Sequence, residues 1–233
     1  MAVNKGLAAA RGGPFALAAT AYRLTPAFAE LPQEPAYLET IGALPAGAAV
    51  RASRLLAWPP GARVNETLLW RVELLDTARG GALVSRSEYF LSSLDTDASS
   101  GWPSMAALRD ARYAAAPVVL SVAAAGVASG AGAVRVSVSV ALAAGAARAA
   151  LAVRCALHDP AAAVVAATGF TDDRALPQLP SAGYFSLLPG EARVVTIDAA
   201  AAAGGGLYVR VDAWNALAVD VPVTVAPLRR GRE

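Results

Sequence analysis

The sequence is poor in the residues that most often build catalytic and metal sites: it has one cysteine and one histidine. A single cysteine, Cys155, excludes a disulfide bond within the chain. A single histidine, His158, excludes a metal site built from several histidines. No G-x-S-x-G serine motif accompanies this histidine, so a general base at His158 has no recognisable nucleophile beside it. The sequence therefore predicts neither a metal nor a cofactor.

The chain also lacks an excess of charge of either sign. The chain has 20 basic and 18 acidic residues, which gives a formal net charge of +2. The basic residues are scattered, except for the arginines of the tail at residues 229–233. Nucleic-acid-binding domains concentrate Lys and Arg in a patch or stripe. We therefore expect no nucleic-acid partner, and we interpret the tail as a solvated end.

Long hydrophobic runs are absent, although 56% of the residues are hydrophobic. Alanine carries most of this fraction, and no run approaches the ~20 apolar residues of a transmembrane helix. We therefore expect a soluble chain with no membrane partner. Residues 14–21 resemble a weak signal-peptide core, but Phe15, Leu17 and Ala19 alternate with smaller residues as they would in a strand. Localisation stays open, and Asn65, in the triplet Asn-Glu-Thr, is a glycosylation acceptor only on a secretory route.

Strict alternation of apolar and polar residues is the dominant pattern. Every even position of residues 134–142 is apolar, as in a strand with one buried and one solvated face. Residues 68–76 repeat the pattern, and it predicts that Trp70 points inward while Arg71 and Glu73 point outward. The same alternation predicts further strands at residues 82–91, 192–198, 207–214 and 217–225.

Glycine-rich turns separate these strands, and a polar segment at residues 92–101 interrupts the pattern. We predict an all-β fold of two tandem immunoglobulin-like antiparallel β-sandwiches, each of about seven strands. The expected boundaries are a first sandwich at residues 1–93, a linker at 94–116, a second sandwich at 117–228, and the tail. The only convincing helical pattern, at residues 103–112, lies in the linker.

Cys155 and His158 both fall in the predicted strand at residues 151–158. Cys155 alternates with Leu151, Val153 and Leu157, so a buried core thiol is favoured over a nucleophile. His158 is then expected on the opposite face or at the strand end.

Two segments of the second half resemble the last β-sandwich domain of glycoside hydrolase family 2 enzymes. Residues 184–191, Tyr-Phe-Ser-Leu-Leu-Pro-Gly-Glu, are similar to an aromatic-Ser-Leu-x-Pro-Gly-Glu turn in β-mannosidases and exo-β-glucosaminidases. Residues 209–215 are similar to the Gly-Trp-Asn-like strand that ends this domain. Residues 83–91 resemble the Ser-Arg-Asn-x-Tyr-Trp-Leu strand of the preceding immunoglobulin-like domain, with Ser87 and Phe90 replacing its Asn and Trp.

The resemblance implies an accessory role, because family 2 catalysis uses two glutamates on a (β/α)₈ barrel. Such a barrel needs about 250 residues of alternating strands and helices, and this chain has no such pattern. Its glutamates are scattered and show no catalytic pairing. The implied function is a non-catalytic domain pair that braces the catalytic barrel of a family 2 β-glycosidase, on the same or a separate chain. The alternatives are a freestanding two-domain module that binds glycan or protein, and a hydrolase with an unrecognised site.

Aromatic residues make up only 6% of the chain, and several of them are candidate contacts. We expect Tyr184, Phe185 and the two leucines after them to fill the space between two sheets, while Pro189-Gly190 reverses the chain. A sugar-stacking platform at Tyr184 and Phe185 is the alternative. For Trp214 and Asn215, a core tryptophan with a strand-capping asparagine is favoured over a ligand contact. The two remaining candidates, expected at the junction of the sandwiches, are Trp58 and Trp102.

Overall fold

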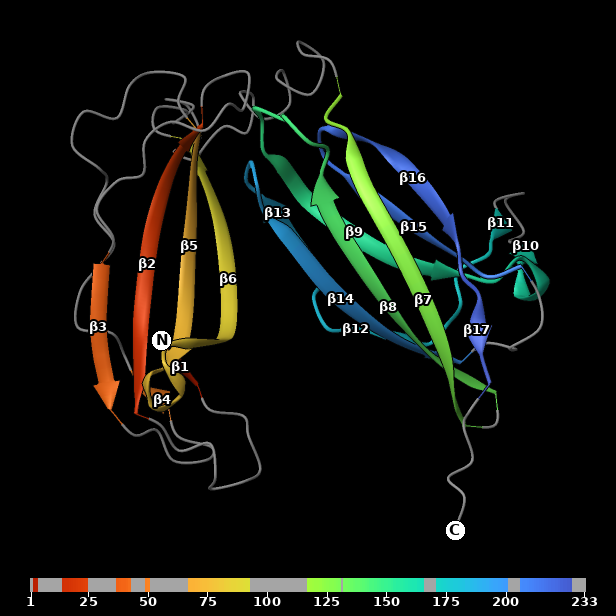
Figure 1. The fold of residues 1–233 in the computed structure, drawn as a ribbon, viewed down its shortest axis with the longest axis horizontal. Helices are drawn as coiled ribbons and strands as arrows, with labels where there is room; N and C mark the ends of the chain where they lie inside the picture. The colour runs from red at the N-terminus through yellow and green to blue at the C-terminus, as the bar shows by residue number, and fades with distance from the viewer. Residues whose placement is uncertain are drawn as a thin grey trace, which may run out of the picture. The chain divides into compact units, whose positions relative to one another are not determined.

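The computed structural model of the chain describes residues 2–3, 14–24, 37–42, 49–50, 67–92, 117–130, 132–165, 171–200 and 206–227. The chain divides into two compact units, residues 1–114 and residues 115–233 (Figure 1). The predicted linker at residues 94–116, with its helix at 103–112, lies outside the described residues, as does the tail at 229–233.

Unit 1 contains a four-stranded antiparallel sheet with the order β3-β2-β5-β6. Its central strands are β2 (Phe15–Leu24) and β5 (Thr67–Asp76), which pair over their whole length. Residues 14–21, which resemble a weak signal-peptide core in sequence, lie almost entirely in β2. The remaining strands of the unit are β3 (Tyr37–Gly42), β6 (Ala82–Ser92) and the short pair β1 (Ala2–Val3) and β4 (Ala49–Val50).

Residues 76–81 form one of the glycine-containing turns expected between strands. A short 3₁₀ helix, η2 (Thr77–Arg79), joins β5 to β6. Asp76 begins this helix by accepting a hydrogen bond from the Ala78 amide at 3.0 Å. Gly80 and Gly81 follow with φ of 65° and 81°, a backbone conformation in which a side chain is strained.

One orientation predicted for β5 is wrong. Trp70 is buried as predicted, but Arg71 is only 2% exposed. Its guanidinium pairs with Glu88 on β6 at 3.1 Å, and the Glu88 side chain is 8% exposed, so neither residue is a solvated outward position. Leu69, on the same face of β5 as Arg71, is fully buried. Both faces of β5 are therefore covered at this end, which simple alternation of residue types could not reveal.

Unit 2 is built from a five-stranded sheet, β12-β14-β8-β7-β17, and a four-stranded sheet, β13-β9-β15-β16. Neighbouring strands are antiparallel except β17, which pairs parallel to β7. The strands of the first sheet are β7 (Leu120–Gly130), β8 (Ala133–Leu142), β12 (Gln178–Pro180), β14 (Ala192–Ala200) and β17 (Val225–Ala226). Those of the second are β9 (Ala150–His158), β13 (Tyr184–Leu187), β15 (Tyr208–Ala213) and β16 (Ala216–Pro222).

The two sheets of unit 2 form two layers around one hydrophobic cluster (Figure 1). Strand β8 contributes every second residue to the cluster, from Val134 to Leu142, which confirms the predicted inward face. Strands β9 and β15 contribute from the other layer, with Val153, Cys155 and Val211 among the buried residues. The core therefore fixes which side chains of β9 and β15 face solvent.

The all-β prediction is confirmed for the described residues, which contain no α-helix. The two larger sheets of unit 2 hold more strands than the predicted seven, because β12 and β17 add short edge strands. With three and two residues, these strands are too short for alternation to reveal. A small additional pair, β10 (Val164–Val165) and β11 (Thr171–Asp172), follows the 3₁₀ helix η3 (Pro160–Ala162). In the described part of the chain no helix is long and apolar enough to cross a membrane.

Candidate functional site

The outer face of the β13-β9-β15-β16 sheet carries a group of polar and charged side chains. On β9, Cys155 and Leu157 point into the core, so Arg154, Ala156 and His158 point to the other face. Strand β15 runs antiparallel beside β9 and places Asp212, Arg210 and Tyr208 opposite these three residues, in that order.

A cavity of about 450 Å³, which we call the polar hollow, lies on this face. It is lined by Arg154, Ala156, His158, Asp172, Asp173, Arg174 and Arg210. Ala156 lies between Arg154 and His158 on β9 and opposite Arg210 on β15. Its short methyl side chain leaves space between these longer side chains and forms the floor of the hollow. Residues 172–174 form a wall, held to the end of β9 by an antiparallel bridge between Arg174 and His158.

Each arginine of the polar hollow is paired with an aspartate. Arg154 Nη2 donates to Asp212 Oδ2 at 2.7 Å, across the β9–β15 pair. Arg210 donates to both carboxylate oxygens of Asp220, on β16, at 2.8 and 2.7 Å. The third pair, Arg174 with Asp172, has its shortest bond at 2.6 Å. This pairing lowers the pKa of Asp172 to about 2, chiefly through the side-chain hydrogen bond from Arg174.

His158 is the most enclosed polar side chain of the hollow, with 8% of the side chain exposed. Its Nδ1 lies 2.7 Å from Asp173 Oδ1, and its ring stacks on Tyr208 with centroids 4.9 Å apart and an interplanar angle of 16°. The Tyr208 hydroxyl donates to Asp173 Oδ2 at 2.6 Å. The hydrogen bond from Tyr208, followed by that from His158, lowers the pKa of Asp173, and the same Tyr208–Asp173 bond raises the pKa of Tyr208.

This arrangement holds the His158 ring in one orientation. Because Asp173 occupies Nδ1, Nε2 is the ring nitrogen left for a ligand, and no hydrogen bond to it is seen among the described residues. Among the described residues that line the hollow there is no serine, threonine or cysteine that the imidazole could activate. Within the ranges that the structure describes, no group of three or more His, Cys, Asp or Glu side chains is placed to hold a metal ion. The geometry suits noncovalent recognition of a polar group.

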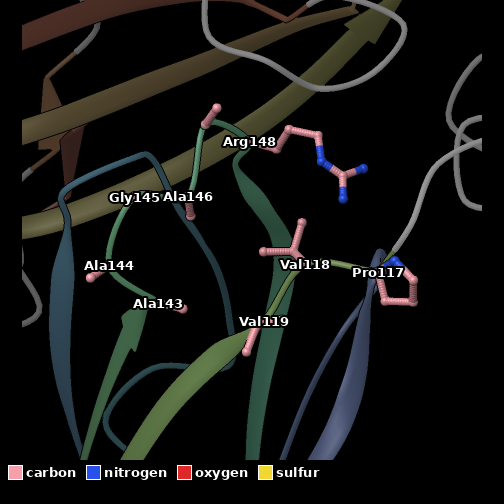
Figure 2. Close-up of a pocket in the computed structure, with 9 residues that line it drawn as sticks. Pro117, Val118, Val119, Ala143, Ala144, Gly145, Ala146 and Arg148 are labelled. Carbon is pink, nitrogen blue, oxygen red and sulfur yellow. The ribbon is translucent and has the colours of Figure 1, made fainter.

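A second cavity, of about 270 Å³, lies at the end of unit 2 where β7 begins, and Figure 2 shows its lining. It is formed by residues 117–119 and by the turn at residues 143–148. Alanines and Gly145 supply most of the turn, and Arg148 is the only charged residue among the described residues of the lining. This cavity offers little for specific binding beyond shape.

The turn at residues 184–191 has the predicted geometry with one exception. Phe185, Leu187 and Leu188 are buried at 1 to 3% exposure and pack as predicted, but Tyr184 is 69% exposed. The prediction that Tyr184 lies in the core is wrong, because this residue begins β13 on the outer face, opposite Arg154 of β9. Glu191 closes the Pro-Gly turn, since its carboxylate accepts from the Leu188 amide at 2.8 Å.

Of the two predictions for Trp214 and Asn215, one is wrong and one is correct. The prediction of a core tryptophan is wrong, because Trp214 lies just after β15 and is 42% exposed. Asn215 is buried and bonds backbone groups, as the capping interpretation predicts. Its Oδ1 accepts from the Leu151 amide and its Nδ2 donates to the Ala149 carbonyl, both at 2.9 Å.

Cys155 is a core thiol, as predicted. It is 3% exposed, and burial raises its pKa to about 12, so the thiolate that a nucleophile requires is disfavoured. His158 lies at the end of β9, one of the two places expected for it. The remaining predicted contacts, Trp58 and Trp102, and the acceptor Asn65 lie outside the described residues.

Sequence reasoning missed the polar hollow as a site and singled out His158 alone. Arg154, Arg210 and Asp212 occupy outward strand positions, which the alternation predicts correctly. The missing information was that β9 and β15 are neighbours, although their paired positions lie 50 to 58 positions apart in the sequence. The adjacent charges at residues 172–174 were the available signal, since three consecutive charged residues are unusual in this alanine-rich chain.

No model of a known protein family matches the sequence, and comparison with curated proteins gives no match. Solved structures do match. The exo-chitosanase CsxA of Amycolatopsis orientalis gives a TM-score of 0.69 at 21% identity, over 94% of this chain and 24% of that chain. A complex of a variant of the same enzyme with PNP-beta-D-glucosamine gives 0.69 at 22% identity, with the same coverage of each chain. At this identity the likeness establishes the fold, and the chain spans about a quarter (24%) of the length of the enzyme it matches.

Proposed function

We propose that the chain is a non-catalytic accessory domain pair of a family 2 β-glycosidase, similar to exo-β-glucosaminidases and β-mannosidases, and that it braces the catalytic barrel. One observation carries the proposal: 94% of this chain matches a part equal to 24% of an exo-chitosanase. A match that uses almost all of one chain and a small part of the other is what an accessory portion of a larger enzyme would give. The turn at residues 184–191 and the strand at 209–215 resemble the last domain of the same family.

The proposed domain organisation is two immunoglobulin-like sandwiches at residues 1–93 and 117–228, joined by a linker at 94–116 that carries a short helix. In unit 2, the shared core between a five-stranded and a four-stranded sheet supports this assignment. In unit 1, the four-stranded sheet around β2 and β5 supports it. The proposed partner is a catalytic (β/α)₈ barrel, on the same or a separate chain.

The experiment that tests the proposal is reconstitution. The purified chain is assayed for hydrolysis of aryl β-mannosides and β-glucosaminides, alone and mixed with a family 2 barrel that lacks its C-terminal domains. An unrelated two-domain β protein at the same concentration is the control. The expected result is no hydrolysis by the chain alone and a gain in barrel activity or thermal stability on mixing. Hydrolysis by the chain alone, or no effect of the chain on the barrel, would overturn the bracing role.

The second candidate function is a freestanding module that binds glycan or protein. Tyr184 and Trp214, at 69% and 42% exposure, favour it, because both aromatic side chains were expected in the core and stand at the surface instead. Under this candidate, the chain alone binds its partner and the barrel changes nothing.

A further inference from the structure

The polar hollow presents hydrogen-bond donors and acceptors side by side. Three guanidinium groups stand in it, and aspartates accept from all three: Asp212, Asp220 and Asp172. With Asp173, four carboxylates stand beside three guanidinium groups and outnumber them by one; Asp172 and Asp173 line the hollow itself. An anion would meet these carboxylates, and a cation would meet the arginines that already bond them. A neutral ligand rich in hydroxyl groups fits, because each hydroxyl both donates and accepts.

The hollow is preorganised for such a ligand. Asp173 is fixed by hydrogen bonds at 2.7 Å to His158 and 2.6 Å to Tyr208, and the stacked Tyr208 ring fixes His158 in turn. Ala156 at the floor and the flanking Arg154, His158 and Arg210 belong to paired strands, which move less than loops do. A site whose polar groups are already ordered loses less conformational entropy on binding. Its volume of about 450 Å³ lies within the range of small-molecule sites, about 300–1,000 Å³.

An exposed aromatic ring stands beside the hollow. Tyr184 of β13 is paired in register with Arg154 of β9, so the tyrosine adjoins the polar lining. Its side chain is apolar on both ring faces and 69% of the residue is exposed. A pyranose ring carries hydroxyl groups at its rim and presents an apolar face of C–H groups. That face can stack on an exposed aromatic ring.

We propose that the polar hollow binds a neutral pyranose saccharide, with Tyr184 against the sugar face and the paired Arg and Asp side chains on its hydroxyl groups. Arg154 and Arg210 donate to hydroxyl oxygens, Asp172 and Asp212 accept from hydroxyl groups, and His158 Nε2 faces the ligand. The inference stands whether the chain braces a barrel or acts alone, because every residue in it belongs to unit 2.

The unique histidine makes the test site-specific. The chain labelled with ¹⁵N has one imidazole, so a long-range ¹H–¹⁵N spectrum reports on His158 alone. The probes are cellobiose, β-1,4-mannobiose and N,N′-diacetylchitobiose, which are neutral, and inorganic sulfate as the anion. We expect a saturable shift of the His158 resonances with at least one saccharide and none with sulfate. No saturable shift with any saccharide, or saturation by sulfate alone, would overturn the proposal.

Two variants locate the binding. Arg154→Gln removes a guanidinium from the hollow, and Arg135→Gln removes one from a matched cross-strand pair, Arg135–Asp198 at 2.6 Å, on the other sheet. Both arginines are well exposed, at 46% and 58%, so both variants are expected to fold. We expect the dissociation constant to rise about tenfold or more in Arg154→Gln and to change less than about twofold in Arg135→Gln. Equal effects of the two variants would contradict the proposed location.

Should Arg154→Gln lose the native circular dichroism spectrum, Asp212→Asn tests the same pair from its other side. The same tenfold weakening is expected, and unchanged binding would overturn the proposal. All of these titrations use the chain without a barrel. A failure of saccharide binding is therefore distinguishable from a failure of the bracing role, which the reconstitution assay measures.

Discussion

Arg71 and Glu88 form an ion pair inside unit 1, with Nε 3.1 Å from Oε1 and the two side chains 2% and 8% exposed. The residues face each other across the β5–β6 pair. The guanidinium carbon of Arg71 also lies 5.3 Å from the centroid of the Tyr22 ring. A charge this deeply buried is stabilised by a close opposite charge, because solvent compensates it poorly there.

Neutralising Glu88 is predicted to destabilise unit 1. In Glu88→Gln the side-chain shape is kept, but Arg71 loses the negative charge that lies 3.1 Å from its Nε. We expect the free energy of unfolding of unit 1 to fall by about 3 kcal/mol, the lower end for breaking a buried pair. Hydrogen exchange followed by mass spectrometry measures this locally, in the peptides that cover β5 and β6, while peptides of unit 2 keep their protection.

Glu73→Gln is the matched control for this prediction. Glu73 pairs with Arg86 at 2.6 Å on the same two strands, but these side chains are 23% and 20% exposed. Solvent screens this pair, so its loss is expected to cost below about 1 kcal/mol. Equal destabilisation by the two variants would show that burial of the Arg71–Glu88 pair does not set its importance.

Removing the side-chain amide of Asn215 is predicted to destabilise unit 2. The amide satisfies the Leu151 N–H and the Ala149 C=O, both at 2.9 Å, and the residue is 7% exposed. Asn215→Ala leaves two backbone groups unpaired, each costing about 1–3 kcal/mol. We expect a loss of about 2–4 kcal/mol in the unfolding free energy of unit 2, measured by urea denaturation.

Leu217→Ala is the comparison for Asn215→Ala, because Leu217 lies nearby in the chain and is 70% exposed. A surface substitution of this kind changes stability by about 0.5 kcal/mol or less. A loss in Asn215→Ala no larger than in Leu217→Ala would mean that solvent satisfies the two backbone groups.

The sequence was sufficient for the strands with one buried face. In β8, alternate residues from Val134 to Leu142 are buried, because each side of this strand meets one kind of environment. The same rule failed at Arg71, where both faces of β5 are covered. It also failed for Tyr184 and Trp214, because an aromatic residue at a strand end has no alternating neighbours to fix its side.

The candidate site was less predictable than the fold. Its side chains come from β9, from β15 and from the segment at residues 172–174, and the paired positions of β9 and β15 lie 50 to 58 positions apart in the sequence. A local pattern shows which face of a strand is buried, but it does not show which strand lies beside it. Once β9 and β15 are known to pair, Arg154 opposite Asp212 and His158 opposite Tyr208 follow directly from the register.

Acid is predicted to weaken unit 2 partly through Asp172. The pKa of this carboxyl group is about 2 in the folded chain, against an ordinary value of 3.8. The folded state therefore binds fewer protons than the unfolded state between these values, so stability falls as the pH falls. The contribution is fully present above about pH 5 and is lost as the pH falls through about 2.

Arg174→Gln tests this acid response, because the side-chain hydrogen bond from Arg174 is the main cause of the lowered pKa. We expect the urea midpoint of unit 2 to fall less steeply between about pH 5 and pH 2.5 in this variant than in the parent chain. Asp172→Asn should show the same shallower fall, because it removes the titrating group. An unchanged pH dependence in both variants would assign the acid response to other carboxyl groups.

Gly126 is predicted to be required by the close approach of the chain after β16 to β7. A Cβ at this position would lie 2.9 Å from Val223 Cγ1 and 3.2 Å from Val225 Cγ2, and the Gly126 amide donates to the Thr224 carbonyl at 3.2 Å. We expect Gly126→Ala to lower the unfolding free energy of unit 2 by about 1–3 kcal/mol through overpacking.

The double variant Gly126→Ala/Val223→Ala identifies the cause of that loss. If the new methyl group clashes with Val223, shortening this side chain makes room, and the double variant loses less than the sum of the single losses. A coupling of about 1 kcal/mol is expected for residues in contact. Stabilisation by Gly126→Ala alone, at about 0.4–1 kcal/mol, would instead mean that stiffening of the unfolded chain outweighs the contact. Simple additivity would place the strain elsewhere, at Val225 or in the pairing of β17 with β7.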